Sequence, residues 1–324
     1  MTSPNAICLN MLFSSLITRH CHMVFVLHYS WRNSLAVNFS GLHFRLMNFP
    51  KFWARGSSGD FFCWRWSSQS LAEAQSLADQ AARQIAERFP DGVFPAKPGG
   101  YYPDRPFREE VLQEIKDGDG QITAVVTRNS YGCLVLNTAR AMFVDIDFPE
   151  SKSSGGFFSR FFGKPQPQPI VDLPAGTMTK IEDWTRNHAD WGWRVYRTRA
   201  GLRLLATHAP VAANAANIDS VFSALGADAL YWKLCNTQKC FRARLTPKPW
   251  RCGLRQKPER WPWLDDRRKK RFENWEGKYQ VCSAQWATCE FLRQIGNPVV
   301  HPEIQSIIKI HDLPSRIESK LPLA

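Results

Sequence analysis

The chain has no uninterrupted apolar run of about 18 residues, the length that an α-helix needs to cross a bilayer, so we expect no membrane partner. It also lacks the Gly-x4-Gly-Lys-Ser/Thr loop, the glycine fingerprint of dinucleotide-binding folds and the Gly-x-Ser-x-Gly turn. Internal repeats are absent as well. These absences weigh against the common ATPase, dehydrogenase and hydrolase classes and against a repeat architecture.

Paired Cys-x2-Cys knuckles are missing too, although the chain contains nine cysteines. An odd number without regular spacing argues against a disulfide framework, so we expect reduced thiols and a cytoplasmic protein. Cys235, Cys240 and Cys252, with His208, are irregularly spaced for zinc. We favour buried free thiols over a zinc site.

Acidic residues are outnumbered, with 42 Lys and Arg against 29 Asp and Glu and a formal net charge of +13. A strongly positive surface favours phosphate-rich partners, and we expect nucleic acid and nucleoside triphosphates. The alternative is that the cations are scattered for solubility.

The domain organisation follows from changes in composition and periodicity along the chain. Residues 1–46 show neither helical nor strand periodicity, and a more regular passage opens at Met47. We therefore expect a poorly ordered leader, and one hypothesis is that the true start is Met47. Residues 150–169 are rich in Ser and Gly and then in Pro and Gln, which is typical of a flexible inserted loop. The sequence thus predicts one α+β domain over 47–324, a largely antiparallel sheet flanked by helices.

Local patterns place the elements. A capping box at Ser70 and Glu73 opens a predicted helix whose apolar face carries Leu71, Ala74, Leu77, Ala78, Ala81 and Ile85. Residues 122–127, 132–137 and 141–148 read as an antiparallel meander. The predicted helices are 70–88, 108–115, 179–188, 217–225, 227–234, 265–279 and 301–311, and the other strands are 61–67, 193–198, 201–207, 240–245 and 287–292.

Asp145 and Asp147 lie two residues apart in an apolar strand, so both point to one face. Two adjacent carboxylates raise each other's pKa and are costly to bury unless a cation lies between them. Mg²⁺ or Mn²⁺, which take oxygen ligands, would supply that charge. The alternative is a strand end that faces water.

Two basic segments follow. The first joins strands 193–198 and 201–207 by a turn whose amides and guanidiniums suit a triphosphate or a nucleic-acid backbone; its candidates are Thr198, Arg199, Gly201, Arg203 and His208. In a plain hairpin these arginines would be solvated.

The second basic segment carries Arg242 and Arg244 on one face of a strand, followed by Lys248 in a proline-rich turn. Two guanidiniums on one face need an anionic partner. That partner is either a phosphate or an internal carboxylate such as Asp145 or Asp228.

Residues 255–271 combine Trp261 and Trp263 with eight Lys or Arg residues, a mixture that suits single-stranded nucleic acid. The alternative is a helix with a solvated basic face, partnered by Asp265, Asp266 and Glu273, with the Trp rings packed beneath it.

Taken over residues 124–251, the order of these motifs resembles the archaeo-eukaryotic primase superfamily. The resemblance implies a primase-like core in which Asp145 and Asp147 hold the metal ions and Asp228 is the third catalytic acid. It also implies that Arg203, His208, Arg242 and Arg244 surround the phosphates. The hairpin departs from the family pattern. Arg203 stands where the family often has His, and Ala206-Thr207-His208 offers a small-x-His motif only later.

On this resemblance we expect a metal-dependent nucleotidyltransferase that uses Mg²⁺ or Mn²⁺ and acts on nucleic acid with nucleoside triphosphates. Two alternatives stay open. One is a non-catalytic nucleic-acid-binding protein of the same fold, and the other is a metal-dependent nuclease that shares the acids.

Overall fold

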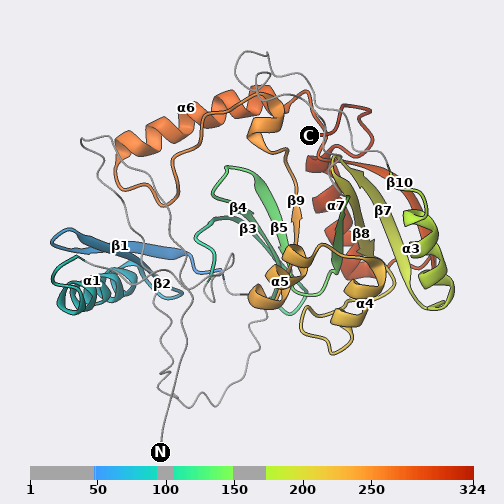
Figure 1. The fold of residues 1–324 in the computed structure, drawn as a ribbon, viewed down its shortest axis with the longest axis horizontal. Helices are drawn as coiled ribbons and strands as arrows, with labels where there is room; N and C mark the ends of the chain where they lie inside the picture. The colour runs from blue at the N-terminus through green and yellow to red at the C-terminus, as the bar shows by residue number, and fades with distance from the viewer. Residues whose placement is uncertain (1–46, 48, 93–105, 149–172) are drawn as a thin grey trace, which may run out of the picture.

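The computed structural model describes residues 47, 49–92, 106–148 and 173–324. Within them, three antiparallel sheets combine with helices (Figure 1), so the prediction of a mixed α+β fold is confirmed at that level. The predicted leader at 1–46 and inserted loop at 150–169 lie outside the described residues. No helix in the described part of the chain is both long enough and apolar enough to cross a membrane.

A hairpin with a helix packed on it forms the N-terminal part of the described chain. Strand β1 (Phe52–Ser58) pairs with β2 (Phe61–Ser67), and α1 (Leu71–Arg88) begins as predicted, with the Ser70 side chain accepting a hydrogen bond from the Glu73 amide at 3.1 Å. The helix is buried through Ala74, Ala78, Ala81 and Ala82. Leu71 and Leu77, predicted on the apolar face, are exposed, because only small side chains fit against the hairpin.

The second sheet has the order β3-β4-β5-β9, from Glu110–Lys116, Ile122–Arg128, Leu134–Thr138 and Phe241–Arg244. The helix predicted at 108–115 is wrong, because this segment forms β3 and pairs antiparallel with β4. Its sequence, Glu-Val-Leu-Gln-Glu-Ile-Lys, has good helix propensity, but long-range pairing outweighs a weak local preference.

The third sheet has the order β10-β7-β8-β6, from Cys289–Gly296, Gly192–Thr198, Gly201–Ala206 and Phe143–Asp147. The predicted meander therefore ends at β5, since β6 leaves that sheet and pairs with β8. The pairing of β7 with β8 through a short turn is as predicted. β6 and β9 contact each other, so the acidic strand lies where the two four-stranded sheets meet.

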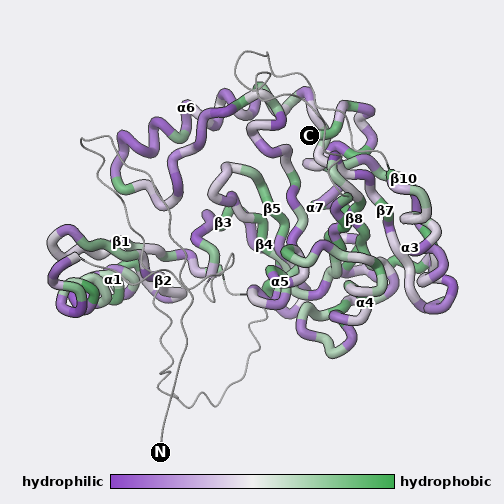
Figure 2. Tube along the Cα trace, in the orientation of Figure 1, coloured by the Kyte–Doolittle hydropathy of each residue, from purple (hydrophilic) through white to green (hydrophobic). Residues whose placement is uncertain are grey.

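Further helices lie around the second and third sheets (Figure 1). They are α3 (Thr177–Arg186), α4 (Ile218–Leu225), α5 (Ala229–Gln238), the 3-10 helix η1 (Pro249–Cys252), α6 (Asp266–Ser283) and α7 (Pro302–Ser315). Apolar residues concentrate in the strands, whereas α6 is mostly hydrophilic (Figure 2). The main core includes Phe143, Trp193, Tyr196, Phe222 and Ile304.

Candidate acidic and phosphate-binding site

The acid pair stands at the C-terminal end of β6, held in register by a glycine. Asp145 pairs with Arg203 and Asp147 with Gly201 across β6 and β8. A Cβ atom at Gly201 would lie 1.9 Å from the carbonyl oxygen of Ile146, so no other residue allows this approach of the two strands. Gly201 therefore acts through its lack of a side chain, by bringing the hairpin turn beside the acids.

Asp145 is neutralised within the protein by Arg203. The guanidinium Nε donates to Oδ1 at 2.8 Å and Nη2 donates to Oδ2 at 3.3 Å. Arg203 is buried, and its Nη1 donates to the carbonyl oxygen of Arg244 at 3.0 Å. Arg203 thus ties together β8, β6 and the end of β9, rather than facing an open phosphate site.

Asp228, the third predicted acid, lies directly beside this pair. Its amide donates to the carbonyl oxygen of Asp145 at 2.8 Å, and its Oδ1 accepts from the Tyr231 amide at 2.7 Å as the N-cap of α5. The Tyr231 hydroxyl donates to the carbonyl oxygen of Phe143 at 3.1 Å. The start of α5 is therefore fixed onto β6, which brings Asp228 next to the backbone of Asp145.

Asp147 is the acid left without a partner. Its side chain reaches solvent from a partly buried position and makes no hydrogen bond or ion pair with the other described residues. Partial burial raises its pKa, and the negative charges of Asp145 and Asp228 raise it further, against the opposing effect of Lys248 and Arg244. A cation bound at this carboxylate would relieve that repulsion.

The segment from the end of β9 into η1 carries Arg244, Lys248 and Arg251 and is called the cationic turn below; Lys248 and Arg244 act electrostatically on Asp147. Burial, together with the positive charges of Arg244 and Arg251, lowers the pKa of Lys248 to about 8. The turn is rigid because Pro247 and Pro249 are buried and the Tyr279 hydroxyl of α6 donates to the Pro247 carbonyl oxygen at 2.5 Å. Crowded cations favour an anionic ligand, so this turn suits a phosphate group.

Arg242 does not join this group. It forms a buried ion pair in which Nη2 contacts both carboxylate oxygens of Glu109, at 2.8 and 2.9 Å. Thr127 donates to the same carboxylate at 2.6 Å. Of the two predicted partners, the internal carboxylate is the one observed, but Asp145 and Asp228 were the wrong residues. Glu109 lies 133 positions away in sequence, where no local pattern marks it.

His208 is also elsewhere. It follows the far end of β8 from Gly201, with its ring 4.5 Å from that of Trp191, and its Nδ1 accepts from the Gly192 amide at 3.5 Å. Burial lowers its pKa. Thr198 and Arg199, by contrast, stand at the hairpin turn next to Gly201, at the same end of the sheet as Asp147.

The side chains suit a metal ion that is shared with a bound phosphate better than an ion held by protein ligands alone. Within the described ranges, no three His, Cys, Asp or Glu side chains form a group that could hold a metal ion. Mg²⁺ is often bound through one or two carboxylates completed by substrate phosphates. Asp147, with Asp228 nearby and phosphate on the cationic turn, fits that arrangement, whereas both oxygens of Asp145 already contact Arg203.

The cysteines considered for zinc are free and buried. Burial raises the pKa of the Cys235 thiol and raises that of Cys240 and of Cys252 to about 12. In the described structure these three thiols are therefore buried, protonated groups, as expected for free core cysteines.

The basic segment 255–271, which runs into the first turns of α6, is partly paired. Glu259 forms ion pairs with Arg268 and Arg271, and Asp265 lies 3.6 Å from Arg268, as predicted for one of the acidic partners. Trp263 packs on Phe272 with ring centroids 5.0 Å apart. These contacts match the alternative of a charged helix with its aromatic residues packed beneath.

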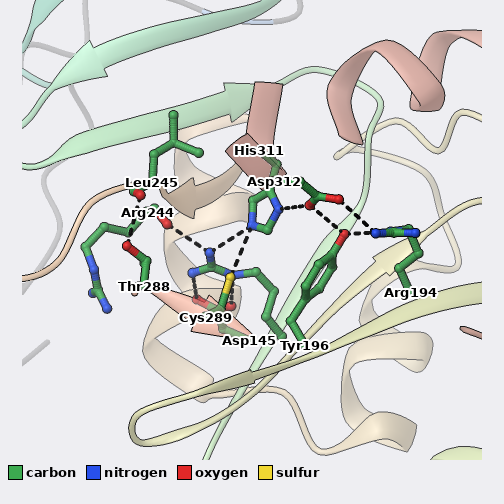
Figure 3. A network of polar contacts seen from close by, with 10 residues as sticks. Asp145, Arg194, Tyr196, Arg244, Leu245, Thr288, Cys289, His311 and Asp312 are labelled. Atoms are coloured by element: carbon green, nitrogen blue, oxygen red, sulfur yellow. Dashed lines mark hydrogen bonds and ion pairs between the residues drawn. The ribbon is translucent and has the colours of Figure 1, made fainter. Parts of the chain in front are cut away.

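Sequence reasoning missed a second group around Arg203. His311 and Asp312 of α7, together with Tyr196 and Arg194 of β7, continue the polar contacts away from Asp145 (Figure 3). A single His-Asp pair on an amphipathic helix carries no recognisable motif, so only the folded chain reveals it.

Comparison of the chain with protein-family models, with curated proteins and with solved structures found no match.

Proposed function

We propose that this protein is a metal-dependent nucleotidyltransferase of primase-like type, which acts on nucleic acid with nucleoside triphosphates. The observation that carries the proposal is Asp147, a carboxylate without a hydrogen bond or ion pair among the described residues, whose charge is felt both by two other acids and by Lys248 and Arg244. A divalent ion and a triphosphate together would satisfy both sets of charges.

The chain's own groups have distinct parts in this chemistry. Arg244 and Lys248 would neutralise the triphosphate, and Lys248, with a pKa of about 8, holds a proton at neutral pH that it can give to a leaving pyrophosphate. Asp147, with Asp228 beside it, would hold Mg²⁺ or Mn²⁺. The ion, when bound, supplies charge stabilisation to the transferred phosphoryl group. Asp145 and Arg203 fix the strand that carries Asp147.

The direct test is incorporation of labelled nucleotide on primed and unprimed templates with Mg²⁺ or Mn²⁺. We expect incorporation by the wild type and a loss of about 10- to 100-fold or more in Asp147→Asn, because a ligand of the ion is weakened. Asp119→Asn is the matched control, since it makes the same change at an exposed turn between β3 and β4. Equal incorporation by wild type and Asp147→Asn would remove the proposal.

A non-catalytic nucleic-acid-binding protein is the second candidate, favoured by the Asp145–Arg203 ion pair. One of the two predicted metal ligands already has a buried guanidinium as its counter-ion. Salt-sensitive binding of nucleic acid without any product would support this candidate. Shortened strands in the same assay would instead identify a metal-dependent nuclease.

A further inference from the structure

His311 lies in the middle of a buried polar network that starts at Asp145. Its side chain is fully buried on α7, with rings of Phe143 and Tyr196 at centroid distances of 5.2 and 4.8 Å. Figure 3 shows Asp145 on one side of His311 and Asp312, Tyr196 and Arg194 on the other. His311 therefore connects the acid pair to groups on β7 and α7.

The contacts of His311 fix its protonation state. Its Nε2 lies 3.3 Å from Nη1 of Arg203, and its Nδ1 lies 2.8 Å from Oδ1 of Asp312. A guanidinium can only donate and an ionised carboxylate can only accept, so Nε2 accepts and Nδ1 carries the proton. Burial, which lowers the pKa of His311, supports the neutral ring.

Asp312 is itself held firmly. Its Oδ1 also accepts from the Tyr196 hydroxyl at 2.9 Å, and its Oδ2 accepts from Nη2 of Arg194 at 2.8 Å. Arg194 Nε donates to the same hydroxyl at 2.8 Å. The carboxylate has a partner on both oxygens, so the ring that donates to it has one favoured orientation.

We propose that His311 is a positioning residue for the candidate site, acting through Arg203. In its Nδ1-protonated form it accepts from Arg203 Nη1, which holds the guanidinium in the plane that contacts both oxygens of Asp145 and the carbonyl oxygen of Arg244. Of the residues fixed in this way, Asp145 acts electrostatically on Asp147, and Arg244 acts on Lys248.

If His311 were purely structural, it would make the same contacts, but its loss would not change the candidate site. The two possibilities differ in what happens when the acceptor is removed and the ring volume is kept. Arg203 would then lose an acceptor for Nη1 and could turn away from Asp145. The effect on ligand binding rests on the proposed function, whereas the effect on Arg203 does not.

The test uses nuclear magnetic resonance of the full chain with labelled histidine and arginine side chains. The His311 ring signal is assigned by its loss in His311→Gln, and the Arg203 Nε–H signal by its loss in Arg203→Lys. We expect a neutral His311 protonated at Nδ1. We also expect Arg203 Nε–H exchange to be about tenfold faster in His311→Phe and restored in His311→Gln, whose amide keeps one donor and one acceptor.

Ile308→Val, a buried apolar change on the same helix that removes no polar contact, is the control for general loosening. An Nε2-protonated or charged ring in the wild type, or unchanged Arg203 exchange in His311→Phe, would overturn the proposal.

The link to the site is measured by the affinity for Mn²⁺ with a nucleoside triphosphate. We expect a loss of about 10- to 100-fold in His311→Phe and recovery in His311→Gln. Unchanged affinity in His311→Phe would overturn the positioning role. A wild type that binds no Mn²⁺-nucleotide, with the resonance results as expected, would refute the proposed function and leave the positioning of Arg203 by His311 in place.

Discussion

At the scale of single residues, the three acids differ in how their charge is balanced. Asp145 has a buried guanidinium, Asp228 caps a helix, and Asp147 has neither. A pattern of Asp-x-Asp in a strand predicts the shared face but not this division of roles. The pair Asp145 and Asp147 was predicted from its local spacing in an apolar strand, whereas Asp228 was predicted only from the resemblance to the primase superfamily. It placed Arg203 on a phosphate, because the partner of a buried arginine depends on packing.

The raised pKa of Asp147 predicts how stability depends on pH. The folded protein binds the Asp147 proton more tightly than the unfolded chain does, so the contribution of Asp147 to stability becomes more favourable as pH falls from neutral towards the ordinary Asp range near ~4. Asp147→Asn should therefore be more stable than wild type at neutral pH, with the difference shrinking as pH falls. Urea unfolding across this range measures it, and a difference that grows on acidification would contradict the assignment.

Arg242 and Glu109 should behave as a structural pair. Removing either partner leaves a buried charge, so Arg242→Ala and Glu109→Ala should each cost about 3–5 kcal/mol in the free energy of unfolding. The double variant should cost much less than the sum. Arg186→Ala, which breaks an exposed ion pair with Asp183, should change stability by less than about 1 kcal/mol. Additive effects of the two buried changes would argue against the pair.

At the scale of elements, periodicity and capping signals gave most helices and strands. They failed where a distant partner decides the outcome. Residues 110–116 become β3 because β4 is available to pair with them, and β6 leaves the predicted meander because β8 offers buried neighbours on the other side. The strand β1 was not predicted, since its alternation of Phe, Trp, Ala and Arg is short and irregular.

Two glycines test how the elements fix the site. Gly201→Ala should destabilise the protein by about 3 kcal/mol, because the new Cβ would meet the Ile146 carbonyl oxygen. Gly277→Ala, on an open face of α6, should stabilise it by about 0.5–1 kcal/mol through helix propensity. Thermal and urea unfolding of both variants would check this, and a neutral Gly201→Ala would mean that β6 and β8 are not as close as described.

At the scale of the whole molecule, the candidate site lies where two four-stranded sheets meet. β6 brings the acids from one sheet, β9 and its turn bring the cations from the other, and α7 brings His311 from near the C-terminus. The net charge of +13 and the composition predicted an anionic partner but not the location of its site. Convergence of segments so far apart in sequence is a property of topology, which no single segment encodes.

The central claim is that Asp147 and the turn around Lys248 together bind a metal ion and a triphosphate. The most direct measurement is calorimetric titration of the full chain with a nucleoside triphosphate in the presence of Mn²⁺, on wild type, Asp147→Asn, Lys248→Met and the control Lys309→Met on exposed α7 surface. We predict binding by wild type and Lys309→Met, and a loss of about tenfold or more in the other two, since charge-assisted contacts contribute roughly 1.5–3 kcal/mol each. Absence of binding by the wild type, or equal binding by all four proteins, would contradict the claim.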